Sequence, residues 1–156
     1  RLVGSEMCIR DRYINRLSRT TGVFYNSRLR DYGIGQCHHP YILLICREPG
    51  IPQEKISREI CVNKSNVTRQ LTALEEKGLI IRKQDSNDRR VWRVYPTEKM
   101  QQLLPVVRQV MGEWNEYLLE ELSQQEREVL VQALEKVTAR ANEAARELLG
   151  GRERQP

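Results

Sequence analysis

The 156-residue sequence lacks the features typical of membrane and secreted proteins. No apolar run approaches the roughly 18 residues that span a bilayer, and the N-terminal segment has no apolar stretch of the kind found in signal peptides. The four cysteines show no CxxC spacing, and a chain of this length folds without disulfides, so we interpret them as reduced thiols. Together these absences predict a cytoplasmic protein.

Histidine is scarce, and motifs for catalysis are absent. The two histidines, His38 and His39, are adjacent and follow Cys37 directly. Adjacent residues rarely converge on one tetrahedral ion, so a metal sensor built on these three residues is a weak alternative. No phosphate-binding glycine loop is present, and no nucleophile is paired with a base. We therefore expect no enzymatic activity, no cofactor and no metal site.

Charge is distributed unevenly along the chain. The net charge is +5, yet residues 63–95 hold eight Lys and Arg against four Asp and Glu, whereas residues 97–149 hold six against ten. The first segment thus carries +4 and the second −4. A concentrated basic segment favours a nucleic-acid partner. Hydrophobic residues make up 39% of the chain, which is typical of one folded domain.

Apolar residues at three- and four-residue steps predict a first helix over residues 11–32, ended by Gly33 and Gly35. Residues 1–12 show no clear periodicity, and we expect them to be poorly ordered or non-native. Pro40 suits the first turn of a second, buried helix that stops at residues 48–50. Pro52 opens a third helix, and residues 61–63 form a tight break.

Asn63 is expected to cap a fourth helix over residues 64–77, with Gly78 as its left-handed stop. Its inner stripe consists of Val67, Leu71 and Leu74, and the opposite face is polar. Residues 79–84 and 91–95 then favour two strands joined by a turn-rich link with arginines at its far end. This order predicts two short helices followed by a β-hairpin.

Two long helices complete the chain. The first begins at Thr97, and the second is introduced by Ser123 and Glu126, which form a capping-box pattern. Their apolar stripes are too long to be covered by one small lobe, so we expect part of them to contact another chain. The fold class is therefore mainly α with a small β-hairpin wing: a winged helix-turn-helix with long N- and C-terminal dimerisation helices.

In a winged helix-turn-helix, the second short helix enters the major groove of DNA and the wing reaches the minor groove. Arginine and asparagine pair with bases there, while hydroxyls contact phosphates or base edges. The residues that we predict to contact DNA are Lys64, Ser65, Asn66, Thr68, Arg69, Thr72, Asp88, Arg89 and Arg90.

Three stretches resemble the MarR family of bacterial regulators from about residue 12 to residue 149. They are residues 62–69 (VNKSNVTR), 74–80 (LEEKGLI) and the wing sequence Asp88-Arg89-Arg90 with residues 94–99 (VYPTEK). The resemblance implies a triangular homodimer whose paired winged helices bind a pseudo-palindromic DNA operator as a repressor. It also implies that Asp88 braces the DNA-binding surface and Arg90 reaches the minor groove, with Arg89 as a substitute.

On this basis we divide the chain into five parts. They are residues 1–12, an N-terminal dimerisation helix at 13–35, the DNA-binding lobe at 36–97, C-terminal dimerisation helices at 98–149 and a tail at 150–156.

The sequence leaves open which signal controls DNA binding. The resemblance implies a small phenolic or other aromatic effector between the dimer helices and the lobe, where we place Tyr25, Cys37, His39 and Tyr41. A cysteine-based redox switch at Cys37 is an alternative, whereas Cys46 and Cys61 stand in apolar contexts and are expected in the core. A winged helix used only for protein contacts is a further alternative.

Overall fold

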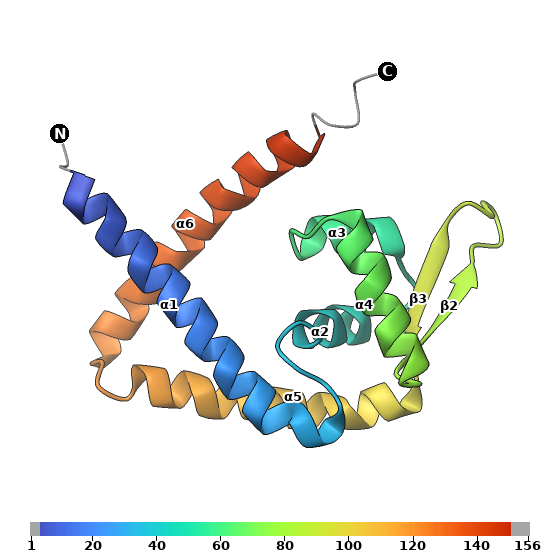
Figure 1. Cartoon of the computed structure of the whole chain (residues 1–156), viewed down its shortest axis with the longest axis horizontal. Helices are drawn as coiled ribbons and strands as arrows, with labels where there is room; N and C mark the ends of the chain where they lie inside the picture. The colour runs from blue at the N-terminus through green and yellow to red at the C-terminus, as the bar shows by residue number, and fades with distance from the viewer. Residues whose placement is uncertain (1–3, 151–156) are drawn as a thin grey trace.

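Helices and a small antiparallel sheet make up the computed structural model, which describes residues 4–150 (Figure 1). The elements are α1 (Gly4–Leu29), the 3-10 helix η1 (Arg30–Tyr32), α2 (His39–Arg47), β1 (Ile51–Pro52), α3 (Gln53–Glu59), α4 (Lys64–Glu76), β2 (Ile80–Gln84), β3 (Trp92–Pro96), α5 (Glu98–Leu119) and α6 (Gln124–Gly150). The prediction of a mainly α winged helix-turn-helix is confirmed. None of the helices in this part of the chain combines the length and apolar character that a membrane span requires.

The first helix begins earlier than predicted, at Gly4 rather than near residue 11. Residues 4–12 thus lie in this helix, and residues 1–3 lie outside the described part of the chain; that residues 1–12 are poorly ordered or non-native stays a prediction. From Ser5 to Thr21 the sequence contains neither proline nor glycine, so nothing in it interrupts the helical backbone. Amphipathic periodicity alone therefore placed the start of the helix too late.

The core of the lobe is built around α2. Ile42 and Ile45 of this helix are fully buried, as are Ile56 of α3, Leu71 of α4 and Val94 of β3. Pro40 lies in the first turn of α2, as predicted, where the missing N–H costs no hydrogen bond. α2 is thus the buried centre on which α3, α4 and the β-hairpin are packed.

The sheet has three strands in the order β1-β3-β2, whereas the sequence predicted only the hairpin of β2 and β3. The additional strand, β1, pairs Ile51 with Val94 and Pro52 with Arg93. Two residues are too few for a period-two pattern, and Pro52 at the sheet edge also serves as the N-cap of α3. This strand ties the start of α3 to the base of the wing.

The residues predicted to begin or end helices do so in the structure. Gly78 adopts a left-handed backbone with φ of 69° after α4. The hydroxyl of Thr97 accepts a hydrogen bond from the backbone N–H of Met100 at 3.3 Å and so caps α5. Ser123 and Glu126 form the capping box of α6, because the Glu126 carboxylate accepts from the Ser123 N–H at 2.8 Å.

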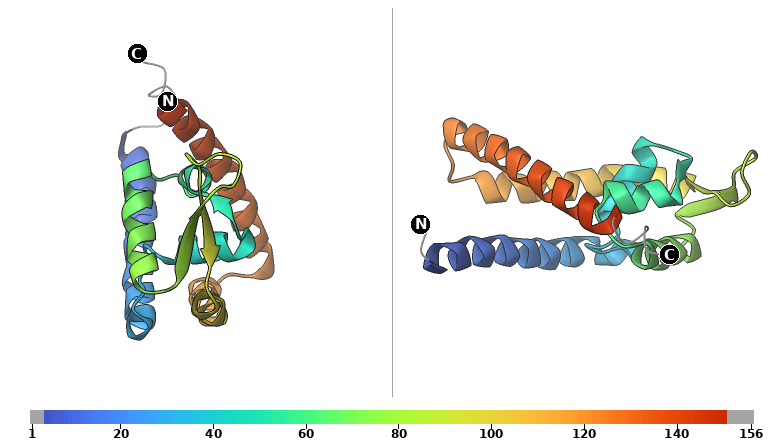
Figure 2. Two further views of the ribbon diagram at one scale, coloured as in Figure 1. Left: turned by 90° about the vertical axis from the view of Figure 1, so that its right-hand side faces the viewer. Right: turned by 90° about the horizontal axis from the view of Figure 1, so that it is seen from above.

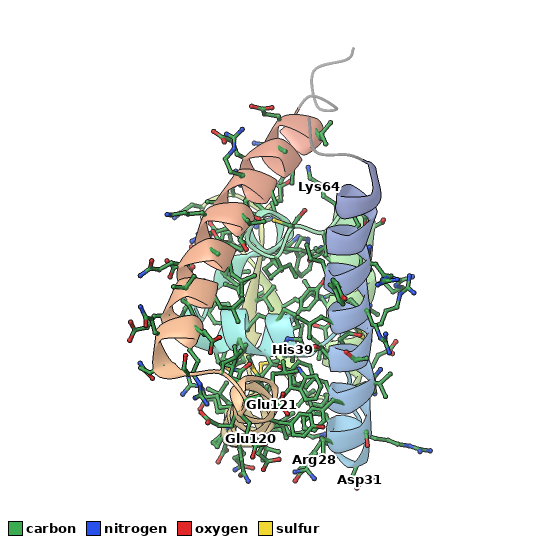
Figure 3. The ribbon with its side chains drawn as sticks, turned by 90° about the vertical axis from the view of Figure 1, so that its left-hand side faces the viewer. Arg28, Asp31, His39, Lys64, Glu120 and Glu121 are labelled. Carbon is green, nitrogen blue, oxygen red and sulfur yellow. The ribbon has the colours of Figure 1, made fainter. Side chains whose placement is uncertain are left out.

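The long helices project from the lobe as arms, and α6 has few contacts with the rest of its own chain. α1 packs on α5, where the Phe24 and Trp114 rings stack with centroids 4.6 Å apart. α1 and α6 cross in Figure 1 but lie apart in both views of Figure 2. Figure 3 shows the two arms on opposite sides, with the side chains of the lobe visible between them. Large apolar side chains on α6 are exposed: Val129, Leu130, Val131, Leu134 and Val137.

Candidate nucleic-acid interface

The N-terminus of α4 is organised by Asn63. Its side-chain oxygen accepts hydrogen bonds from the backbone N–H of Asn66 at 2.8 Å and from the hydroxyl of Ser65 at 2.9 Å. The predicted cap is confirmed, and a cap of this kind contributes about 1 kcal/mol to helix stability. The Ser65 hydroxyl thereby uses its single proton within the protein.

α4 presents one buried face and one polar face. Val67, Leu71 and Leu74 are at most 1% exposed and pack on the core. The other face carries the residues of α4 that we predicted to contact DNA. Exposed among them are Lys64, Ser65, Thr68 and Arg69, whereas Asn66 and Thr72 are half-buried. Lys64 lies 3.6 Å from Glu54 of α3, in a pair so exposed that water screens it. Arg69 forms no ion pair with any residue in the described range.

The hydroxyl groups on this face are engaged inside the protein. The Thr68 hydroxyl donates to the carbonyl oxygen of Lys64 at 3.1 Å and accepts from Nε2 of Gln53 at 3.1 Å. The Thr72 hydroxyl accepts from Arg82 of β2 at 3.5 Å. Gln53 and Arg82 are contacts that the sequence did not suggest, because both join elements that are distant along the chain.

A salt bridge fastens α4 to β2. The Arg82 Nε donates to the Glu75 carboxylate at 2.9 Å, and the Arg82 backbone N–H donates to the same carboxylate at 3.2 Å. The hydrogen bond from Arg82 lowers the pKa of Glu75. Sequence reasoning missed this pair, which links β2 of the hairpin to α4.

A second pair anchors the wing at its base. The Arg93 guanidinium donates to the Asp85 carboxylate through Nε and to the carbonyl oxygen of Gly50 through Nη1 at 2.9 Å. The other Asp85 oxygen accepts from the backbone N–H groups of Asn87 and Asp88 at 2.8 and 3.1 Å. This pair was also missed, although an aspartate that opens a turn commonly accepts such bonds.

At the wing tip, Asp88 holds Arg90. One Asp88 oxygen accepts from the Arg90 backbone N–H at 3.0 Å and from its Nε at 3.2 Å, and the other accepts from Nη2 at 3.4 Å. These hydrogen bonds lower the pKa of Asp88. The Arg90 side chain is nonetheless 92% exposed, and Arg89 beside it is exposed. The tip therefore presents two arginines, one of them oriented by a carboxylate.

The surface between α4 and the wing is concave. A cavity of about 490 Å³ is lined by Gln53, Thr68, Glu75, Arg82 and Trp92. Trp92 lies at the wing end of β3 opposite Gln84 and is 45% exposed, although Val94 on the same face of the strand is fully buried. The hollow thus adjoins the polar face of α4.

The Asp85–Arg93 pair predicts a pH dependence of stability. The hydrogen bond from Arg93, with those from the turn backbone, lowers the pKa of Asp85 from 3.8 to about 2. The stabilisation is therefore complete above the unfolded-state value near pH 4 and is lost as the pH falls through about 2. We expect wild type to melt above Asp85→Asn at pH 5, with the difference in Tm shrinking between about pH 4 and pH 2.5. A difference in Tm that is constant over this range, followed by circular dichroism, would contradict the ion pair.

The four residues predicted for an effector come from α1, the loop that precedes α2, and α2 itself. Tyr25 and His39 meet edge to face with ring centroids 4.7 Å apart, and both Tyr25 and Tyr41 are buried. Burial raises the pKa of Tyr41 to about 12, with a further contribution from nearby Cys37. Burial also lowers the pKa of His39, so its ring is neutral at pH 7. The Tyr41 hydroxyl donates to the side-chain oxygen of Asn66 in α4 at 3.4 Å.

The cysteines differ in burial. Cys37 is exposed, Cys46 is half-buried against the core, and the Cys8 side chain lies outside the described part of the structure. The expectation of a core position for Cys61 is wrong, because Cys61 is exposed and turns the chain between α3 and α4 with a positive φ of 52°. Within residues 4–150, no group of three or more His, Cys, Asp or Glu side chains is placed to hold a metal ion.

A capped helix with an outward polar face, fixed by ion pairs to a hairpin with an arginine tip, defines a winged-helix DNA-binding protein. Residues 40–92 match the model of the MarR family. The matched segment covers most of the winged helix, so the chain is similar to this family, and the similarity supports a DNA-binding regulator; members of the family are transcriptional regulators and not enzymes.

Similar proteins span nearly the whole chain. The uncharacterized HTH-type transcriptional regulator YybA of Bacillus subtilis (strain 168) is 26% identical over 126 residues, which are 81% of this chain and 84% of that protein. A MarR family transcriptional regulator from Listeria monocytogenes, crystallised with a 26mer DNA, is 28% identical with a TM-score of 0.83 over 90% of this chain and 93% of its own. A MarR transcriptional regulator from Methanosarcina mazei Go1 is 28% identical with a TM-score of 0.82, over 87% of this chain and 98% of its own.

Proposed function

We propose that the protein is a homodimeric repressor that binds a pseudo-palindromic DNA operator and leaves it when a small aromatic ligand binds. The observation that carries this proposal is the outward polar face of α4 beside a wing whose tip presents Arg89 and Arg90. Chromosomal DNA as the partner would place the protein in the cytoplasm of a bacterial cell.

In the proposed complex, α4 lies in the major groove and the wing tip lies over the adjacent minor groove. Arg69 is long, exposed and able to donate two hydrogen bonds to a guanine edge. Lys64, at the first turn of α4, contacts phosphate as a point charge. Arg90 enters the narrow minor groove, where the negative potential is enhanced, and Asp88 orients it.

A second copy of the chain supplies the other half-site. The exposed apolar side chains of α6, together with Tyr13, Ile14 and Leu17 of α1, provide the dimerisation surface. A two-fold axis through these arms pairs the two lobes, and a symmetric protein suits a symmetric site. The 26mer DNA bound to the relative from Listeria monocytogenes supports DNA as the partner.

The proposed effector acts through Tyr41. Tyr25, His39 and Tyr41 offer aromatic faces and hydrogen-bonding groups of the kind that hold a phenol. Because the Tyr41 hydroxyl donates to Asn66 in α4, a ligand that takes this hydroxyl as its own partner shifts the recognition helix. The differential contact that drives release is thus the loss of the bond between Tyr41 and Asn66.

Cys37 supports a second candidate input, because its thiol is exposed and lies close enough to Tyr41 to influence that group electrostatically. Hydrogen peroxide is then expected to release wild type from DNA and to leave Cys37→Ser bound. Release of both proteins by phenols, with no response of either to peroxide, assigns the input to the ligand.

Selection of duplexes from a random library, followed by titration at several salt concentrations, tests the function directly. We expect one enriched pseudo-palindrome whose affinity falls steeply with salt. A protein that retains no duplex at low salt would be a winged helix used for protein contacts, and the proposal would be wrong.

Two models of the wing predict opposite changes in operator affinity when Asp88 is replaced by alanine. If Asp88 orients Arg90, Asp88→Ala weakens operator binding about threefold and Arg90→Ala weakens it about tenfold, because the guanidinium loses its place in the minor groove. If the wing acts only by its net charge, removal of a carboxylate near phosphate strengthens binding instead, most clearly at low salt.

Titration of labelled operator at two ionic strengths distinguishes these outcomes. Glu121→Ala is the matched control, since it removes one negative charge at the far end of α5 (Figure 3). Circular dichroism checks that each variant is folded. Tighter binding by Asp88→Ala than by Glu121→Ala would refute the orienting role of Asp88.

A further inference from the structure

The hydroxyl of Thr68 has no proton left for DNA. It donates to the carbonyl oxygen of Lys64, one helical turn earlier, and it accepts from the side-chain amide of Gln53. A threonine hydroxyl carries a single proton, so it cannot donate to a phosphate, to guanine N7 or O6, or to thymine O4. The side chain is nevertheless exposed, and its other terminal group is the γ-methyl.

Gln53 also selects which way Thr68 points. Threonine in a helix divides between two rotamers, because its hydroxyl can bond a carbonyl of the preceding turn in more than one of them. The 3.1 Å bond from Gln53 Nε2 holds the hydroxyl at the position where it donates to Lys64. Gln53 begins α3 directly after β1, so the methyl direction is set by a neighbouring element.

The surroundings of Thr68 offer few other groups to a base. Thr68 lines the cavity between α4 and the wing, and the charged residues of that cavity, Glu75 and Arg82, are bonded to each other. Thymine is the base that displays a methyl group in the major groove, and threonine methyls are among its usual apolar partners.

Given the proposed docking of α4 in the major groove, on which this step rests, we propose that Thr68 contacts a thymine 5-methyl group and that Gln53 is its positioning residue. Thr68 is then a specificity-determining residue that selects thymine by an apolar contact. Arg69, next in sequence, provides the hydrogen bonds to a neighbouring base.

Deletion of single methyl groups from the DNA tests the contact without altering the protein. The probe is the duplex that wild type selects most strongly from a random library, with each thymine replaced in turn by deoxyuridine. Burial of one methyl corresponds to about a fourfold change in affinity. We therefore expect about a fourfold loss at one thymine in each half-site and less than twofold elsewhere. If every replacement changes affinity less than twofold, the proposal is wrong.

Two variants assign that thymine to Thr68. Thr68→Ser keeps the hydroxyl and removes the methyl, so it should bind the thymine and deoxyuridine duplexes equally. Thr68→Val keeps a methyl at this position and removes the hydroxyl, so it should retain discrimination of about fourfold. The reverse pattern, with discrimination kept in Thr68→Ser and lost in Thr68→Val, overturns the proposal, because the γ-methyl of Thr68 would then not be the group that contacts the thymine methyl.

Gln53→Ala tests the positioning role. The readout is the ratio of the affinities for the thymine and deoxyuridine duplexes, not the affinity for either duplex alone. We expect the ratio between thymine and deoxyuridine duplexes to fall below twofold, while binding to non-specific DNA stays unchanged. A ratio that remains near fourfold removes Gln53 from the proposal. If wild type selects no duplex at all, the proposed function itself fails; a selected duplex without a methyl-sensitive thymine overturns only the role of Thr68.

Discussion

Leu134→Glu is expected to break the dimer and to lower operator affinity by at least about a hundredfold. Leu134 lies in the middle of α6 and is 53% exposed in the single chain, with Leu130 and Val137 one turn away on the same side. A charge placed in this stripe meets apolar surface of the partner and loses its hydration. Each released chain then holds one half-site, and the avidity of the paired lobes is lost.

Sedimentation velocity at micromolar concentration measures the first effect. Wild type should sediment at twice the 18.3 kDa mass of the chain. Gln132→Glu is the matched control, because it introduces the same charge into α6 on the side opposite Leu134 and should remain dimeric. Loss of folded structure in Leu134→Glu would agree with an obligate dimer. Wild type that sediments as a stable monomer would refute the dimer.

Arg69→Ala should cost about 1 to 3 kcal/mol on the selected operator and relax base preference at one position in each half-site. Arg69 is exposed and lies one residue after Thr68 on the outer face of α4. Its truncation removes a bidentate contact with a base edge, so the loss appears on the cognate sequence and is small on other sequences.

Lys64→Ala is the matched comparison for Arg69→Ala. Lys64 occupies the first turn of the same helix, and we assign it to phosphate. Its removal should weaken binding to all sequences alike and reduce the slope of affinity against salt by about one. Titrations of cognate and scrambled duplexes at three salt concentrations separate the two. If both variants lost specificity equally, the division into base and phosphate contacts would be wrong.

Features that depend on neighbours along the chain could be predicted from the sequence. The inner stripe of α4, its Asn63 cap and the Gly78 stop depend on helical spacing and on hydrogen bonds that close within one turn. The capping box of α6 is local in the same way. The order of these elements, together with the wing sequence, sufficed to predict the winged helix and the similarity to the MarR family.

Features that join distant segments were decided only by tertiary structure. β1 exists because two residues meet β3 across the sheet, and the exposure of Cys61 follows from the turn that it makes between two packed helices. Asp85 binds Arg93, and Glu75 binds Arg82. The Thr68 hydroxyl accepts from Gln53, and each of these partners lies on another element. Several arginines in the sequence could serve each carboxylate equally well, because charge alone does not choose among them. Packing of α4 against the sheet made the choice, and with it decided which polar groups remain exposed on α4.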